Sequence, residues 1–99
     1  MTTKEKDFQA KVIKYLRSKK CYVVKNQAGP GVPNGCPDCF FFTQGFFGAL
    51  EFKKSRGSKL QPGQKETIEK FNEWSYGRIC YPENWPEVKE ELDSLLKEY

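Results

Sequence analysis

The sequence predicts an α/β protein in which a mixed β-sheet is flanked by helices. Two observations favour this fold class. Segments with apolar residues at helical spacing alternate with short runs rich in β-branched and aromatic residues, and clusters of Gly, Pro and Asn separate them. In chain order the segments read helix, three strands, helix, strand and a C-terminal helix. The 99 residues fit one domain, 1–99, by ordinary domain size.

The N-terminal part is expected to begin with a helix over residues 4–19, because its apolar residues fall on one stripe. That stripe consists of Phe8, Val12, Tyr15 and Leu16. Thr2 with Glu5 three residues later matches a capping box that would begin this helix. A strand over 21–24 should follow, and then a loop over 26–36 that is dense in Gly, Pro and Asn.

A β-hairpin is predicted around Gln44-Gly45, which fits a two-residue turn between the apolar runs 38–43 and 46–54. The turn length fixes which residues of the two strands lie opposite each other. The predicted pairs include Thr43 with Phe46, Phe40 with Ala49, and Asp38 with Glu51.

The C-terminal part should contain a basic loop over 55–61, a helix from Pro62 to near Gly77, a strand over 78–81 and a last helix from Pro86. We expect the first of these helices to direct Ile68, Phe71 and Trp74 inward. The last helix carries an apolar stripe. Its members are Val88, Leu92, Leu95, Leu96 and Tyr99.

The predicted hairpin brings Asp38, Glu51 and Lys53 to one face of the sheet. Two opposed carboxylates repel each other, and a hard divalent ion such as Mg²⁺ or Mn²⁺ would compensate their charge. Such a site suits metal-assisted hydrolysis of phosphodiesters, with Lys53 orienting the water or stabilising charge on the phosphate. The alternative is an ordinary pair of surface charges. The apolar residues around them favour the site, because buried charges are rare unless paired or metal-bound.

Composition narrows the chemistry further. The chain has no histidine, which excludes His-based nucleases, Ser-His-Asp triads and His-ligated zinc sites. Its formal charge of +4 permits a polyanionic partner without demanding one. We find neither a membrane-spanning segment nor the apolar core of a signal peptide. The expected location is therefore the cytoplasm, or the host cytoplasm for a phage-encoded protein.

The cysteines raise a second possibility, because Cys36 and Cys39 form a C-x-x-C motif. A redox pair of this type usually begins a helix, whereas three phenylalanines follow here and predict a strand. A zinc site needs two more ligands at close spacing, but Cys21 and Cys80 each stand alone. Reduced, buried packing residues are therefore the default, and a Cys-ligated zinc-binding domain is kept as an alternative.

A resemblance to a known family supports the nuclease interpretation. Gly35-Cys36-Pro37-Asp38 followed by Glu51-Phe52-Lys53 resembles the PD-(D/E)XK nuclease signature. The wider pattern, from about residue 5 to residue 81, is similar to the VRR-NUC branch, in its stand-alone phage and bacterial form. The further matches are Glu5 with Phe8-Gln9, Lys25-Asn26-Gln27, the basic loop and Gln64.

The resemblance implies a restriction-endonuclease-like αβββαβ core followed by the C-terminal helix. It also implies a Mg²⁺ or Mn²⁺ cofactor, DNA cleavage that leaves 5′-phosphate ends, and a homodimer acting on branched DNA such as four-way junctions. The leading prediction is thus a metal-dependent endodeoxyribonuclease, a hydrolase acting on ester bonds. Two alternatives stay open: a non-catalytic DNA-binding module of the same fold and the zinc-binding domain.

Carried over to single residues, the resemblance makes Asp38 and Glu51 metal ligands, with the backbone carbonyl of Phe52 as a third, and Lys53 the catalytic lysine. Further roles concern the two helices beside this site. Glu5 would bind the metal through water, or only cap its helix. Gln64 would support the lysine or contact phosphate, or only cap its helix. The residues predicted to contact DNA are Lys54, Arg56, Lys59, Lys65 and Gln9, although Gln9 also fits an ordinary solvent-facing position.

Overall fold

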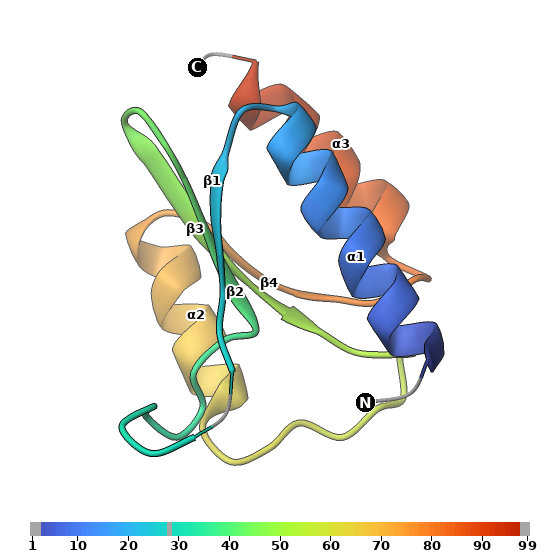
Figure 1. Ribbon diagram of the computed structural model, residues 1–99, viewed down its shortest axis with the longest axis vertical. Helices are drawn as coiled ribbons and strands as arrows, with labels where there is room; N and C mark the ends of the chain where they lie inside the picture. The colour runs from blue at the N-terminus through green and yellow to red at the C-terminus, as the bar shows by residue number, and fades with distance from the viewer. Residues whose placement is uncertain (1–2, 28, 98–99) are drawn as a thin grey trace.

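The computed structural model describes residues 3–27 and 29–97, which form a four-stranded mixed sheet and three helices (Figure 1). The elements are α1 (Thr3–Ser18), β1 (Tyr22–Lys25), β2 (Cys39–Thr43), β3 (Phe46–Phe52), α2 (Gln64–Trp74), β4 (Gly77–Cys80) and α3 (Trp85–Leu96). Their order along the chain is the predicted one. In the described ranges, no helix has the length and apolar character needed to cross a membrane.

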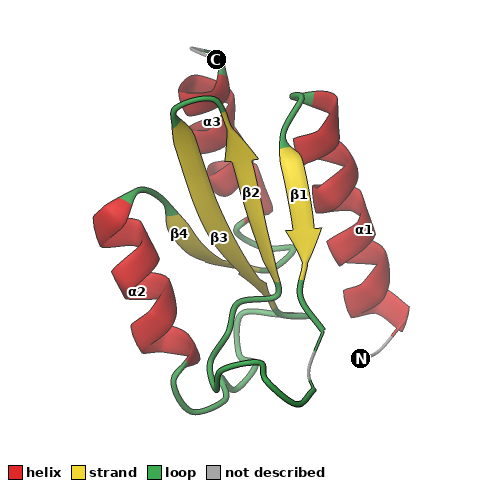
Figure 2. Cartoon of the chain, turned by 60° about the vertical axis from the view of Figure 1, so that its left-hand side comes forward, coloured by secondary structure: helices red, strands yellow, loops and turns green. Residues whose placement is uncertain are grey.

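The strands lie side by side in the order β1-β2-β3-β4 (Figure 2). β1, β2 and β3 pair antiparallel, and β4 joins β3 in parallel. The predicted hairpin register is confirmed through the first residue of β2, because Thr43 pairs with Phe46 and Cys39 with Leu50. Asp38 immediately precedes β2 rather than belonging to it.

Two layers of helix cover the sheet: α1 and α3 lie on one side and α2 lies on the other (Figure 1). The main core fills the space between the sheet and α1 and α3. Its strand residues are Cys39, Phe41, Leu50, Phe52 and Cys80. Its helix residues are Phe8, Val12, Ile13, Leu16, Trp85, Val88, Leu92 and Leu96. Along β2 and β3, side chains therefore point alternately toward this core and toward the opposite face of the sheet.

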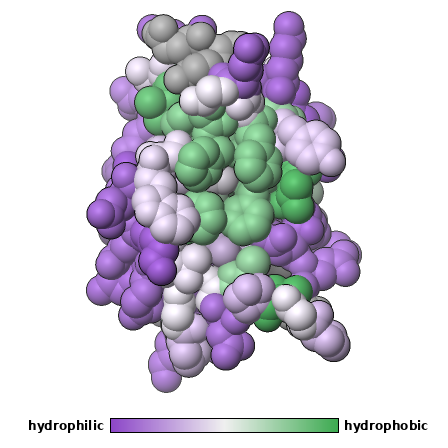
Figure 3. All heavy atoms as spheres, turned by 90° about the vertical axis from the view of Figure 1, so that its left-hand side faces the viewer, coloured by the Kyte–Doolittle hydropathy of each residue, from purple (hydrophilic) through white to green (hydrophobic). Residues whose placement is uncertain are grey.

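The face toward α2 is only partly covered. Phe71 of α2 stacks on Phe40 with ring centroids 5.3 Å apart and meets Phe47 edge-on at 6.2 Å. Beyond this contact, Tyr22 is 72% exposed and Phe42 is 42% exposed. Apolar side chains gather here in the space-filling view (Figure 3). We call this surface the aromatic face: Tyr22, Phe40, Phe42, Phe47, Phe71 and Trp74.

The inward orientation predicted for Trp74 is wrong, because its side chain is 61% exposed. Steps of three residues fall short of a full helical turn of 3.6, so Trp74 lies about 120° around α2 from the buried Ile68. Leu95 is likewise 37% exposed, while Val88, Leu92 and Leu96 of the predicted stripe of α3 are buried. Thr2 and Tyr99 lie outside the described residues.

The start of α2 also differs from the prediction. Gly63 precedes the helix with φ 85°, so the helix begins at Gln64 and Pro62 lies in the turn before it. A left-handed conformation of this kind is accessible to glycine at no steric cost. Gln64 is therefore the first residue of α2, and its side chain contacts Glu51 near the end of β3.

Candidate active site

Asp38 is fixed beside the C-terminal end of β3. Its Oδ2 accepts a hydrogen bond of 2.8 Å from the backbone N–H of Phe52. Asn26 holds the opposite side, because its backbone N–H donates to the Asp38 carbonyl and its Nδ2 donates to the Pro37 carbonyl, both at 2.8 Å. The end of β1 and the end of β3 therefore fix the position of this carboxylate between them.

Glu51 lies on the face toward α2, where only 2% of it is exposed. Its Oε2 accepts a 2.8 Å hydrogen bond from Gln64 Nε2 and lies 3.4 Å from Lys53 Nζ. Its Oε1 is buried and has no hydrogen-bond partner in the described part of the chain. The Lys53 side chain is itself only 14% exposed, so this ion pair is largely screened from water.

The electrostatics of Glu51 reflect this burial. Burial, as the largest cause, and the negative charge of Asp38 raise the pKa of Glu51, Lys53 opposes both, and the net pKa is about 7. The same two acids help to raise the pKa of the nearby Cys36 thiol, after burial as the main cause. The hairpin thus brings Asp38, Glu51 and Lys53 together, as predicted. The single positive charge of Lys53 does not neutralise both acids.

The donor set fits a hard divalent cation. Glu51 Oε1 is an oxygen donor without a partner, and the Asp38 carboxylate supplies a second acid beside it. No three His, Cys, Asp or Glu side chains within 3–27 and 29–97 form a metal-holding group. A cation here would therefore use two acids, and the Phe52 carbonyl stays the predicted third protein ligand. The water-mediated role of Glu5, in the first turn of α1, also stays a prediction.

The capping role predicted for Gln64 is wrong, because Gly63 is the N-cap of α2 and no side chain of the described residues makes a cap hydrogen bond there. Gln64 Nε2 donates to Glu51, and its Oε1 accepts a 2.7 Å hydrogen bond from the backbone N–H of Gln61. The side chain therefore links the turn before α2 to the buried acid. Since Gln64 contacts Glu51 rather than Lys53, it supports the lysine only through the carboxylate that both groups share.

The assignment of Gln9 to the surface is wrong. Only 2% of Gln9 is exposed, which excludes both a solvent-facing position and a direct DNA contact. Phe8 meets Phe52 edge-on at 6.1 Å, so this turn of α1 packs against the C-terminal end of β3. Gln9 Oε1 is buried without a partner among the described residues. Its spacing of four residues from Ile13 was the available signal, because i and i+4 share a helix face.

The cysteines do not assemble a metal site. Cys36 is half-buried in the loop, whereas Cys21, Cys39 and Cys80 are buried, and all four are free thiols. Burial raises the pKa of Cys39 and of Cys80 to about 12, so both stay protonated at neutral pH. The arrangement gives no support to the zinc-binding alternative.

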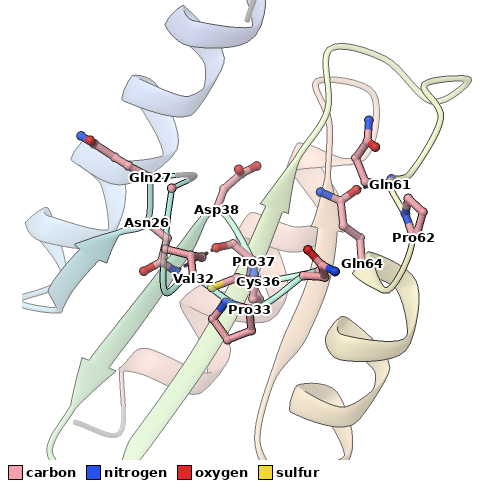
Figure 4. A pocket seen from close by; sticks show the side chains of 13 residues that line it. Asn26, Gln27, Val32, Pro33, Cys36, Pro37, Asp38, Gln61, Pro62 and Gln64 are labelled. Carbon is pink, nitrogen blue, oxygen red and sulfur yellow. Dashed lines mark hydrogen bonds between the residues drawn. The ribbon is translucent and has the colours of Figure 1, made fainter.

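A cavity of about 490 Å³ opens beside Asp38. One wall is formed by the loop between β1 and β2, and the other by residues 61, 62 and 64 at the entry to α2 (Figure 4). Predicted phosphate-binding residues, all exposed, lie in the loop after β3 and at the start of α2. They are Lys54, Arg56, Lys59 and Lys65.

Comparison with protein-family models, with curated proteins and with solved structures found no match for this chain. The resemblance to VRR-NUC enzymes thus rests on the motif residues quoted above. The chemistry of the site follows from the contacts of this chain, in which two acids, one lysine and one glutamine converge at the end of a hairpin.

Proposed function

We propose that this chain is a Mg²⁺- or Mn²⁺-dependent endonuclease that hydrolyses DNA phosphodiester bonds on a restriction-endonuclease-like core of the VRR-NUC type. The observation that carries the proposal is the buried carboxylate of Glu51 beside Asp38, with one oxygen paired to Gln64 and Lys53 and the other without a partner. Burying a charged acid in this way is costly, which favours a functional reason for it.

Each residue of the site has a distinct task in this proposal. Asp38 and Glu51 would hold the ion, which when bound supplies Lewis-acid polarisation of the phosphate and lowers the pKa of water. The Phe52 N–H and the Gln64 side chain keep the two carboxylates in place. Lys53 would orient the attacking water or stabilise the charge that develops on the phosphate. The exposed basic residues would bind phosphates without reading sequence.

We propose further that the enzyme is a homodimer that acts on branched DNA such as four-way junctions. The aromatic face supports a second copy of this chain as the partner. Three of its residues, Tyr22, Phe42 and Trp74, come from three different elements and are 72%, 42% and 61% exposed. Its residues are all aromatic, which suits the apolar interfaces of homodimers and does not suit a phosphate backbone. Two symmetry-related sites would account for paired incisions at a junction.

Cleavage of a labelled four-way junction and of a linear duplex, in Mn²⁺ and in EDTA, tests the function. We expect Mn²⁺-dependent cutting that falls at least about 10²-fold in Asp38→Asn, Glu51→Gln and Lys53→Ala, while DNA binding persists. Glu66→Gln is the matched control, because Glu66 is an exposed acid in the first turn of α2. Equal cutting by the three variants would refute the assignment. Binding without cutting by the wild type would favour the non-catalytic module.

A further inference from the structure

The cavity of about 490 Å³ is continuous with the candidate site, because Asp38 and Gln64 line it. Its two walls meet where Gly35 of the loop approaches Gly63. A Cβ atom added to Gly35 would lie 2.6 Å from the Gly63 carbonyl carbon, so only glycine allows this backbone contact. The loop between β1 and β2 is thereby held against the entry to α2. The space beside the acids is a formed feature of the fold.

Amides dominate the lining of this cavity. The amide side chains are Asn26, Gln27, Asn34, Gln61 and Gln64. Two of them serve the site: Asn26 holds the Pro37 carbonyl, and Gln64 holds Glu51 and the Gln61 N–H. The side chains of the other three make no hydrogen bond within the described residues. They are therefore available to a ligand.

Figure 4 shows Asp38 between Gln27, in the loop after β1, and Gln61, before α2. Asp38 is the charged residue of this lining, which contains no Lys or Arg among the residues that the structure describes. Away from the cation proposed at Asp38, a phosphate placed here would meet no positive side chain of the lining and would be repelled by the acid. Val32 and Pro33 add apolar surface to the same wall.

These features select a class of ligand. A primary amide offers a donor and an acceptor side by side, which matches the edge of a nucleobase bidentately. Apolar side chains provide contact for the faces of an extruded base. An uncharged heterocycle with donors and acceptors on its edge therefore fits the cavity, and a sugar-phosphate does not.

We propose that this cavity binds one unpaired nucleobase next to the phosphodiester that is cut. The inference rests on the proposed function and narrows its substrate to DNA with an unpaired nucleotide at the cleavage point. Because the cavity lies between two walls of protein, a base can enter it only after leaving the helical stack. Unstacking costs least where the nucleotide is already unpaired, as at a branch, a flap or a mismatch. Continuous duplex is then a poor substrate.

Binding in EDTA tests the base site without cleavage. The probes are two fluorescent duplexes that differ at one position, which holds either an unpaired 2-aminopurine or an abasic residue. We expect the wild type to bind the base-containing duplex about tenfold more tightly, the lower part of the range for a bidentate amide–base pair. In the double variant Asn34→Ala/Gln61→Ala, the preference should fall to within about twofold. Gln44→Ala, an exposed glutamine in the hairpin turn, is the matched control.

The 2-aminopurine emission provides a second readout, because it changes when the base leaves the stack. Equal affinity of the wild type for the two duplexes, or a preference that survives the double substitution, would overturn the base site. A base preference together with no cleavage in Mn²⁺ would leave the base site standing and refute the endonuclease. Cleavage in Mn²⁺ with no base preference would leave the endonuclease standing and refute the base site.

Discussion

The two faces of the sheet use the same strands for opposite purposes. Toward α1 and α3, Phe41, Leu50 and Phe52 are at most 1% exposed and pack into one apolar core. Toward α2, the alternate residues include the buried acid Glu51 and the half-exposed Phe42. The first face gains stability from burial, at about 1.5–3 kcal/mol for each large side chain. The second loses stability to a buried charge and leaves apolar surface in water.

This difference indicates where function lies. A face that buries a carboxylate and exposes aromatic rings is poorly suited to an isolated monomer, whereas both features suit ligands: a cation for the acids and another chain for the rings. Substitutions on the two faces should therefore behave differently, and the following predictions test that contrast.

The largest effect is expected on the core face. Phe41→Ala should lower the free energy of unfolding by about 3–5 kcal/mol, because it leaves a cavity in a fully buried site. Urea denaturation with and without Mn²⁺ measures it, and the loss should be similar in both. A loss of under about 1 kcal/mol would show that this face is not the main core.

A smaller effect, with the opposite sign, is expected at Glu51. Burial and the nearby charge of Asp38 outweigh Lys53 and raise the pKa of Glu51 from an ordinary value of 4.5 to about 7, so the folded protein keeps a proton that the unfolded chain releases. In EDTA the free energy of unfolding should therefore fall as pH rises from 4.5 to 7. Glu51→Gln should flatten this dependence and raise the melting temperature at pH 8. A wild type and variant with parallel pH profiles would contradict the burial of the charge.

On the aromatic face, a substitution should weaken dimerisation. Trp74→Lys should raise the dimer dissociation constant at least about tenfold, because exposed tryptophans are frequent anchors of interfaces. The free energy of unfolding of the monomer should change by under about 0.5 kcal/mol, since Trp74 is 61% exposed. Sedimentation at several protein concentrations measures the dimer dissociation constant. A wild type that is monomeric at all of them would remove the second copy from the proposal.

The smallest effect is expected at Leu95, which is 37% exposed on α3. Leu95→Gln should change neither dimerisation nor cleavage, and the free energy of unfolding should move by under about 0.5 kcal/mol. Thermal melting and the junction assay measure these quantities. A large loss of stability or of cleavage in this variant would place a second interface on α3, on the opposite side of the molecule.

Local rules predicted the hairpin and its charged residues. A two-residue turn at Gln44-Gly45 fixes the register, and alternation through the end of β3 then places Glu51 and the following Lys53 on one face. Long-range packing decided what the sequence could not predict. Gln9 is buried because α1 lies against the end of β3, a contact that its spacing of four residues from Ile13 indicates only weakly.

The cavity is likewise a product of long-range packing that the sequence does not predict. It exists because Gly35 approaches Gly63, two residues far apart in the chain whose contact no periodicity announces. Trp74 was misplaced for a different reason, since a spacing of three residues only approximates a helical turn. Sequence patterns thus recovered the elements and the acids, whereas the surroundings of the acids required the folded structure.

The central claim is that Asp38 and Glu51 together bind one divalent cation. Calorimetric titration with Mn²⁺ at pH 8 tests it most directly, with Glu66→Gln as the control acid. We predict one Mn²⁺ per chain in the wild type and in the control, and no measurable binding in Asp38→Asn or Glu51→Gln. Undiminished Mn²⁺ binding in those two variants would contradict the claim.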